Sequence, residues 1–438
     1  MLRRFVLGIG VLAGMAAPGL GQGVIQPGSI PTRRALERVQ LEKHWMGVVP
    51  LGVGERLTLF NVSDNQLFAQ TSRGNLHTYN AETGAYQWGV KLADINSNTL
   101  PVSTNSDMLF VTALKTLHAL DRRTGRPIWK AELDNLPSTG TICDEEVVAV
   151  GLRSGKLQGF NIRDHSKDTP PGYSAGSFAW AWQTGGILKS RPLVTPHLVT
   201  FASTDHKVYT AIKADGDTKS ELIYRYLTAG PISASLVGVG NRTLVVGSED
   251  FNVYGIDLFT AETRWVIATG APIDQEPLVS GDDVIVINER GRLFRISGKT
   301  GQVVWERQSK GQKILALSPS RIYLANIHND LSIIDRATGQ VIHSPRDTQE
   351  TAGLHNRELA LVFPNYQNDR LYAGGHEGLL FCAREIGKLQ PTPLRDPGTP
   401  PFGTIPEDGL KEESTAPPPA AAQNPPAENN APAEDPDK

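Results

Sequence analysis

One spacing recurs five times along the chain and constrains its fold more than any other feature. An Asp, Asn or Ser is followed by Thr three residues later, by Gly or Ala four residues later and by a large ring eight residues later. The five copies begin at Asn80, Asp121, Asp257, Ser297 and Asp335. The short polar side chain can close a strand through a local hydrogen bond, and glycine supplies a left-handed turn residue. A fixed offset that returns at intervals of roughly 40 residues is typical of a repeat architecture.

Each repeat also contains two short β-rich runs joined by a polar turn. Apolar and polar residues alternate in the second run, which is the period of a strand. The first runs begin at Leu67, Leu109, Val147, Leu198, Leu244, Val284, Ile322 and Leu371. A further run precedes each pair and the ring-bearing run follows it, so every unit has four predicted strands. Four-stranded sheets repeated radially form a propeller. The sequence therefore predicts an all-β, eight-bladed β-propeller of four-stranded antiparallel blades.

The large rings indicate how this propeller closes. Seven units carry a ring on the predicted outer strand, namely Trp88, Trp129, Trp182, Tyr224, Trp265, Trp305 and His343. The eighth unit has Pro391 at this place, whereas Trp45 lies near the start of the chain in a run with no unit of its own. We therefore expect the run around Trp45 to be the outer strand of the last blade, which leaves no open edge in the ring. The eight rings are predicted to dock one blade on the next, because buried aromatic area stabilises such contacts.

These residues resemble a known family. Met108 to Trp129 and Leu371 to Phe381 are the segments most similar to the pyrroloquinoline-quinone-like β-propeller repeat, and the resemblance covers about residues 44 to 391. Two branches share the repeat: quinoprotein dehydrogenases, and the non-enzymatic propeller subunit of the outer-membrane β-barrel assembly machinery. The quinone enzymes typically carry an adjacent cysteine pair, and the assembly subunit a lipid-anchor cysteine near its cleavage site. The only cysteines here are Cys143 and Cys382, which fit neither pattern.

Both ends of the chain differ in composition from the repeats. Residues 1–21 combine a basic start with a short apolar stretch, which is typical of a secretory signal peptide. Residues 22–43 are predicted to form a linker with a short helix, in which Leu36, Val39 and Leu41 mark one face. Residues 392–438 are rich in Pro, Ala and Glu and are predicted to be disordered. We expect an exported protein, periplasmic or secreted, with no transmembrane span in its mature chain.

Charge and the chemistry-bearing residues argue against several functions. The formal net charge is −3, and residues 405–438 alone hold eight acids and two lysines, so the remainder is nearly neutral and a nucleic-acid partner is not expected. Cys143 and Cys382 are predicted to be small buried residues on opposite sides of the ring. His206, His328 and His376 fall in separate blades and lack a short-spaced ligand motif. We therefore predict no catalytic residue, metal or cofactor, and a monomeric propeller.

Insertions are the best guide to function, because binding surfaces of repeat proteins concentrate there. Two enlarged connections, Asn161 to Phe178 and Lys213 to Ser220, belong to adjacent blades and leave the same face. The candidate partner-binding residues in the first are Asp164, Lys167, Asp168, Tyr173 and Phe178. The resulting hypothesis is a non-catalytic scaffold that binds other, unidentified envelope proteins. The alternatives are a quinoprotein-like oxidoreductase that binds pyrroloquinoline quinone, and a carbohydrate- or cell-wall-binding propeller.

Overall fold

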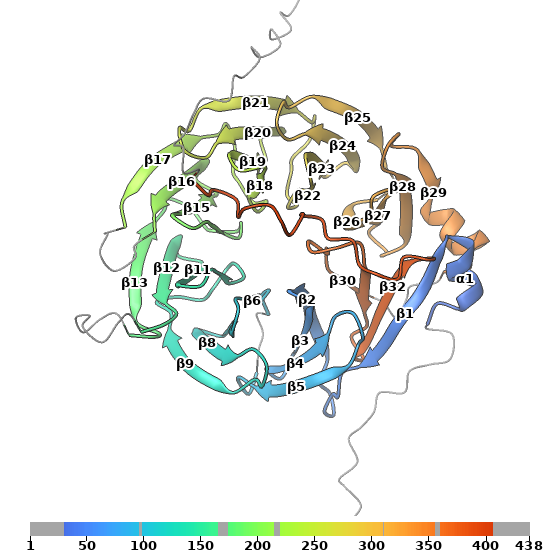
Figure 1. Ribbon diagram of the computed structural model, residues 1–438, viewed down its shortest axis with the longest axis horizontal. Helices are drawn as coiled ribbons and strands as arrows, with labels where there is room; N and C mark the ends of the chain where they lie inside the picture. Colours follow the sequence, from blue (N-terminus) through green and yellow to red (C-terminus); the bar gives the residue numbers. More distant parts are fainter. Residues whose placement is uncertain are drawn as a thin grey trace, which may run out of the picture. The chain divides into compact units, whose positions relative to one another are not determined.

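The chain folds into a ring of β-sheets around a central axis (Figure 1). The computed structural model describes residues 30–95, 99–164, 174–213, 220–309, 311–354 and 360–405. The described residues up to Thr404 belong to one compact unit, and they form eight four-stranded antiparallel sheets. The predicted eight-bladed propeller is confirmed. The predicted signal peptide, residues 1–21, lies outside the described residues.

The first four blades follow one another along the chain. Blade one contains β2 (Leu57–Ser63), β3 (Gln66–Thr71), β4 (Asn75–Asn80) and β5 (Tyr86–Lys91). Blade two contains β6 (Ser103–Thr104), β7 (Met108–Ala113), β8 (Thr116–Asp121) and β9 (Pro127–Glu132). Blade three contains β10 (Ile142–Cys143), β11 (Val147–Gly151), β12 (Lys156–Asn161) and β13 (Phe178–Gln183). Blade four contains β14 (Leu193–Val194), β15 (Leu198–Ser203), β16 (Lys207–Ile212) and β17 (Leu222–Leu227).

The next three blades repeat this order, and the last one departs from it. Blade five contains β18 (Val237–Val239), β19 (Thr243–Gly247), β20 (Asn252–Asp257) and β21 (Thr263–Ala268). Blade six contains β22 (Leu278–Ser280), β23 (Asp283–Ile287), β24 (Arg292–Ser297) and β25 (Val303–Gln308). Blade seven contains β26 (Lys313–Leu317), β27 (Arg321–Ala325), β28 (Leu331–Asp335) and β29 (Val341–His343). Blade eight contains β30 (Leu361–Val362), β31 (Leu371–Gly374), β32 (Leu379–Glu385) and, from the other end of the chain, β1 (Leu41–Val48).

Strand β1 closes the ring as the sequence predicts. It lies antiparallel to β32, with Leu41 opposite Glu385 and Val48 opposite Leu379. The backbone N–H of Val49 extends the ladder by donating to the carbonyl of Gly378 at 2.8 Å. Because the two ends of the chain meet in one sheet, β32 is paired on both sides and blade eight has its fourth, outer strand.

The repeated turn holds the third and fourth strands of a blade together. In blade two, Oδ1 of Asp121 accepts hydrogen bonds from the backbone N–H groups of Arg123 and Thr124, at 3.1 and 2.8 Å, and from the Thr124 hydroxyl at 2.7 Å. These bonds lower the pKa of Asp121, and the Thr124 hydroxyl contributes most. Gly125 follows with φ of 71°, in the left-handed region that glycine adopts without strain.

The glycine of this turn also packs against an aromatic ring of the preceding blade. A Cβ atom on Gly125 would lie 2.4 Å from Cε3 of Trp88, whose Nε1 donates to the carbonyl of Arg122 at 3.0 Å. In blade five the residue at this position of the turn is Ala261, with φ of 64°. The preceding blade presents the smaller ring of Tyr224 to this turn. The repeated glycine and the repeated ring are therefore two halves of one contact between neighbouring blades.

The seam between blades seven and eight is built differently. The third and fourth strands of blade eight come from opposite ends of the chain, so no covalent turn joins them, and helix α1 (Arg33–Arg38) lies there instead. The carbonyl of Val39 accepts from Nη1 of Arg321 in blade seven at 3.3 Å, and the carbonyl of Gln40 accepts from the N–H of Ile386 at 3.2 Å. The end of the helix thus takes the place of a turn.

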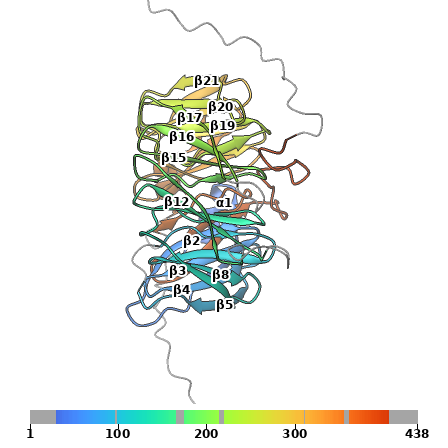
Figure 2. The same ribbon diagram turned by 90° about the vertical axis from the view of Figure 1, so that its left-hand side faces the viewer.

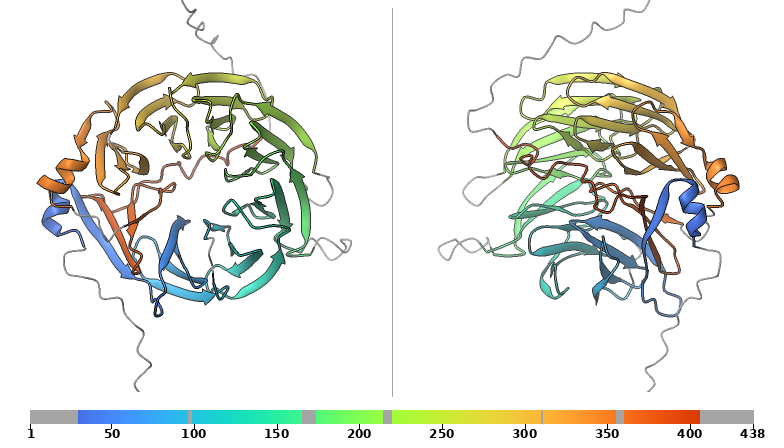
Figure 3. Two further views of the ribbon diagram at one scale, coloured as in Figure 1. Left: turned by 180° about the vertical axis from the view of Figure 1, so that it is seen from behind. Right: turned by 45° about the vertical axis from the view of Figure 1, so that its right-hand side comes forward.

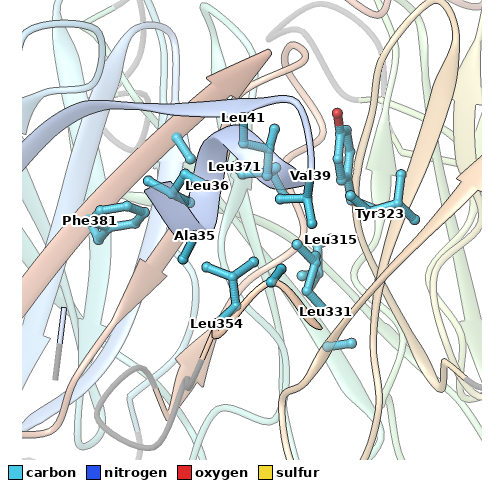
Figure 4. Close-up of a cluster of buried hydrophobic side chains, with 14 of the residues drawn as sticks. Ala35, Leu36, Val39, Leu41, Leu315, Tyr323, Leu331, Leu354, Leu371 and Phe381 are labelled. Atoms are coloured by element: carbon cyan, nitrogen blue, oxygen red, sulfur yellow. The ribbon is translucent and has the colours of Figure 1, made fainter. Parts of the chain in front are cut away.

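Apolar side chains of α1 fill the space where a rim ring would pack. Leu36, Val39 and Leu41 are buried against blades seven and eight (Figure 4). The buried cluster also includes Ala35, Leu315, Tyr323, Leu331, Leu354, Leu371 and Phe381. The sequence predicts Leu36, Val39 and Leu41 on one face of the helix. Only Leu36 lies in the helix, whereas Val39 is its C-cap and Leu41 is the first residue of β1. A π-helical turn, η1 (Asp347–Thr351), lies after the short rim strand β29.

The segment that follows β32 differs from the sequence prediction. Residues 392–404, which we call the strap, follow β32 and run over the face of the ring toward blade five (Figure 1). Disorder was expected from residue 392 because the segment is rich in proline. Two apolar residues overcome this tendency, since Leu394 and Phe402 are each only 7% exposed. The remaining residues of the predicted tail, 406–438, lie outside the described residues.

Candidate partner-binding surfaces

The strand order gives the ring two faces that carry different connections. Connections from the first to the second strand, and from the third to the fourth, leave on one face. The strap contacts connections of this kind, so we call it the strap face (Figure 2). The turns between second and third strands, and the crossings from one blade to the next, lie on the opposite face. Both enlarged loops that the sequence singles out belong to the strap face.

The first enlarged loop is described only at its two ends. Asp164 is exposed, and its Oδ1 accepts from the N–H of Ala175 at 2.7 Å, which links the two ends of the loop. Phe178 is 54% exposed and lies edge-on to Phe160, with ring centroids 6.4 Å apart. Lys167, Asp168 and Tyr173 lie outside the described residues. The structure therefore shows one apolar and one acidic side chain at the base of this loop.

The ends of the second enlarged loop are part of the seam between blades three and four. Nζ of Lys213 lies 2.6 Å from Oδ2 of Asp144 and 3.1 Å from Oε2 of Glu146. Burial acts to lower the pKa of Lys213, but these two carboxylates outweigh it and the pKa is raised. Ser220 accepts from Nε1 of Trp182 at 2.9 Å. Lys213 and Ser220 thus have structural partners of their own.

Most of the predicted docking rings make the same contact. Each donates a ring N–H or O–H to a carbonyl in the turn of the next blade, at distances of 2.7 to 3.2 Å. The pairs are Trp45 with Ala81, Trp88 with Arg122, Trp129 with Ile162, Tyr224 with Leu258, Trp265 with Gly298, and Trp305 with Arg336. His343 is half-buried on β29, and burial lowers its pKa. It lies at the seam that α1 covers.

In blade three the position equivalent to these rings belongs to Trp180 and not to the expected Trp182. Trp180 lies opposite Gly159, just as Trp265 lies opposite Gly255 in blade five. Trp180 is 5% exposed and packs over Gly159. Trp182 lies two residues further along the same face of β13. The extended loop before β13 hides this register, because counting from the turn no longer locates the ring.

A cavity lies inside the ring, where sequence analysis predicts no site. Its volume is about 270 Å³, and it is lined by residues just before the first strands of blades two to six and by Phe363 and Tyr366 of blade eight. The charged lining residues are Lys189, Arg191, Asp274 and Glu276. Lys189 and Asp274 are exposed, so two charges of opposite sign reach the solvent from the lining of the cavity.

Three of the lining residues, from three different blades, contact one another across the ring. Nη2 of Arg191 lies 3.1 Å from Oε1 of Glu276, and its guanidinium lies 5.9 Å from the ring centroid of Tyr366. Glu276 raises the pKa of Arg191, while burial raises that of Tyr366 well above its usual range. Arg191 is therefore charged and Tyr366 neutral across the physiological pH range. The cluster fixes the positions of the charges at the cavity.

A weak sequence signal does mark this cavity. Blade four has Lys189-Ser190-Arg191-Pro192 before its first strand, and blade six has Asp274-Gln275-Glu276-Pro277 at the same place. The two segments share a spacing and have opposite charges. A comparison of the crossings between blades, in place of the strands, could have found them.

Other chemistry-bearing residues lie apart from this cavity. Burial raises the pKa of the Cys143 thiol to about 12, and raises that of Cys382 as well. Within residues 30–405, apart from the gaps given above, no group of three or more His, Cys, Asp or Glu side chains is placed to hold a metal ion. Across the same described stretches, no helix is both long enough and apolar enough to span a membrane.

The closed ring and its repeated turn define the class of protein. The chain is an eight-bladed β-propeller built from pyrroloquinoline-quinone-like repeats. Residues 30–169 and 204–399 match the sequence model of the family described as outer membrane protein assembly factor BamB. These ranges cover well over half of the 438 residues, so the chain belongs to this family.

Individual relatives are distant. The outer membrane protein assembly factor BamB of Shewanella oneidensis is 24% identical over 301 residues, which are 62% of this chain and 70% of that protein. The protein of the same name from Nitrosomonas eutropha is 23% identical over 252 residues, or 54% of this chain and 58% of its own length. Among solved structures, BamB from Moraxella catarrhalis matches 79% of this chain and 98% of its own, with a TM-score of 0.61 at 18% identity. This last likeness concerns the fold.

Proposed function

We propose that the chain is an exported, non-catalytic scaffold that binds other envelope proteins while outer membrane proteins are assembled. Its membership of a family described as an assembly factor supports this role. The cysteine chemistry points the same way, because Cys382 is buried and Cys143 half-buried, neither is in a disulfide, and burial raises the pKa of both thiols, which is typical of structural cysteines.

The observation that carries the proposal is the charged lining of the cavity inside the ring, with Lys189 and Asp274 as the exposed residues that we call the mouth. Lys189 and Asp274 are exposed on either side of the cavity, and Arg191 and Glu276 are held behind them by an ion pair of 3.1 Å. Fixed charges of both signs favour a protein partner with a complementary pattern, because electrostatic complementarity sets register and selects partners. The arrangement suits neither nucleic acid, which requires a basic surface, nor a strongly charged small ligand.

The base of the first enlarged loop is a second proposed contact area. Phe178 supplies exposed apolar surface on the rim of the strap face. Asp164 lies at the other end of the same loop, where its Oδ1 accepts from the N–H of Ala175 at 2.7 Å. Exposed aromatic side chains are common anchors in protein interfaces. In this proposal Lys167, Asp168 and Tyr173 extend the same contact.

Charge reversal at the mouth tests the proposal. A strain that lacks the gene is complemented with the wild-type chain, with the double substitution Lys189→Glu and Asp274→Lys, or with Lys299→Glu and Glu262→Lys as a control on exposed rim turns. Folded outer membrane β-barrels are measured by their altered migration in unheated gels. We expect the mouth variant to lose most of the complementation and the rim control to keep it.

Equal complementation by both variants would exclude the mouth as the contact surface. A Phe178→Ser variant, tested alongside, reports on the loop of the strap face. Titration of the purified wild type with pyrroloquinoline quinone and Ca²⁺, with dye reduction as the readout, tests the oxidoreductase alternative. Quinone-dependent turnover would overturn the scaffold proposal.

A further inference from the structure

The end of the strap is seated in a socket between blades four and five. Phe402 is 7% exposed and packs in one apolar cluster with residues of both blades. The cluster includes Leu198, Val208, Leu236, Leu244 and Leu258. By contrast, residues 395–401 are all exposed, so the ring of Phe402 is the anchor of this end of the strap.

The socket exists because one strand carries glycine where its neighbour carries valine. A Cβ atom on Gly238 of β18 would lie 2.3 Å from Cγ of Phe402, so any side chain there would fill the space of the ring. The equivalent position in blade six is Val279, which lies opposite Val284 as Gly238 lies opposite Leu244. A first strand accepts a side chain at this position, and the glycine of blade five provides room for the phenylalanine.

The position after Phe402 also restricts which residue fits. Gly403 has φ of 76°, and a Cβ atom there would lie 2.9 Å from the side chain of Thr195 and 3.0 Å from Leu258. A larger residue would meet both backbone strain and a clash. The socket therefore accepts Phe followed by Gly.

Asn241 makes two hydrogen bonds to the main chain at the end of the strap. Its backbone carbonyl accepts from the N–H of Gly403 at 3.1 Å, and its Nδ2 donates to the carbonyl of Thr404 at 2.6 Å. The N–H of Thr404 also donates to the carbonyl of Pro401 at 3.2 Å, so residues 401–404 form a β-turn with Gly403 at its left-handed position. The site thus combines a pocket, a glycine requirement and a main-chain clamp.

The other end of the strap is attached separately. The N–H of Leu394 donates to the carbonyl of Gln367 at 3.0 Å, and the N–H of Thr392 donates to Oδ1 of Asp369 at 3.0 Å. The exposed middle therefore runs between two anchors over the strap face (Figure 3). The match to the family model ends at residue 399, before Phe402.

We propose that Gly238, Asn241 and the apolar cluster around them form a recognition site for peptides that carry Phe-Gly in a β-turn, and that residues 401–404 occupy it as an intramolecular ligand. A tethered segment has an effective concentration in the millimolar range. A partner peptide of the same chemistry must displace the strap to bind, and its binding frees the strap face.

A labelled peptide of residues 398–404, Gly-Thr-Pro-Pro-Phe-Gly-Thr, tests this site on the full-length chain. In a Phe402→Ser chain the strap has lost its anchor, so we expect the peptide to bind at least tenfold more tightly than to the wild type. The same peptide with Ser in place of Phe should not bind. Adding Gly238→Val to the Phe402→Ser chain should abolish binding, and this variant is expected to fold because blade six carries valine at that position.

Failure of the peptide to bind a folded Phe402→Ser chain would overturn the proposal, as would equal binding of the Phe and Ser peptides. If the substituted chain does not fold, the wild type serves as the test. The peptide at several millimolar, comparable with the tethered segment, should then speed hydrogen exchange at the Gly403 amide, and the Ser peptide should not. Unchanged exchange with both peptides would equally refute the site.

Discussion

The contact between a rim tryptophan and the turn glycine of the next blade makes a sharp prediction about stability. We compare Gly125→Ala with Gly270→Ala. Both glycines have positive φ, 71° and 75°, so alanine suffers similar backbone strain at each. They differ in surroundings, because a Cβ atom on Gly125 would lie 2.4 Å from Trp88 whereas one on Gly270 would meet nothing within 4 Å.

The magnitudes follow from these contacts. Left-handed backbone costs an alanine about 1–2 kcal/mol, which is the whole expected loss for Gly270→Ala. For Gly125→Ala the ring of Trp88 must also withdraw by about 1 Å to reach ordinary contact, which breaks its 3.0 Å hydrogen bond to Arg122. The lost bond is worth about 1 kcal/mol. Partial loss of the packing of a buried tryptophan adds about 1–3 kcal/mol. We expect a total of about 3–6 kcal/mol.

Equilibrium unfolding in urea, followed by circular dichroism, measures both losses. A Trp88→Tyr background provides the decisive comparison, because the chain itself pairs Tyr224 with Ala261 at the equivalent contact. In that background the cost of Gly125→Ala should fall to that of Gly270→Ala. If the two glycine variants lose the same stability in the wild-type background, the ring does not depend on the glycine and the reasoning is wrong.

Three further predictions concern buried charge, pH and the C-terminal end of the chain. Arg370→Met should cost about 3–5 kcal/mol in urea melts, because Arg370 is fully buried and its removal takes the positive charge away from the carboxylates of Glu82, at 2.7 Å, and Asp369, at 3.4 Å. Burial acts to raise the pKa of Asp257, but hydrogen bonds from Arg264 outweigh it and the pKa lies below its ordinary value of 3.8. The stability from Asp257 is therefore present above pH 3.8 and lost as the pH falls further, so Asp257→Asn should flatten the decline of the urea midpoint between pH 4 and 2. Truncation after Gln390 should lower the melting temperature, because it removes Leu394 and Phe402. Truncation after Ile405 should leave the melting temperature unchanged. Equal melting temperatures for the two truncated chains would contradict the role of the strap.

The repeat unit could be predicted from the sequence because its physics is local. Asp121, Gly125 and the ring eight residues after the aspartate lie within one hairpin, so their spacing along the chain is also their spacing in space. Closure by the strand of Trp45 followed from the same count, because one ring was missing at the end and one was surplus at the start. These contacts recur in most blades, so a departure in one copy does not hide the pattern.

The features that the sequence did not reveal depend on contacts between distant residues. Phe402 lies in a proline-rich segment, and it can anchor the strap only because Gly238 leaves space for its ring. Arg191 and Glu276 pair across the ring although they are 85 residues apart. Trp182 was expected at the place of Trp180 because an enlarged loop changes the count. In the first two cases the decisive partner lies in another blade, where no local spacing can indicate it.

Closure by two ends of one chain has a consequence for biosynthesis. Glu42 and Arg384 pair across 342 residues of sequence. At a translation rate of roughly 5–20 residues per second, β1 waits about 20–70 seconds after its own synthesis before β32 exists. During that interval the nascent chain carries an unpaired strand at one end and grows a new open edge with each blade. The seven other blades can form in order of synthesis, but the ring stays open until nearly the whole chain has been made. The closing step thus acts as a length check, because a chain that stops before blade eight keeps both edges exposed.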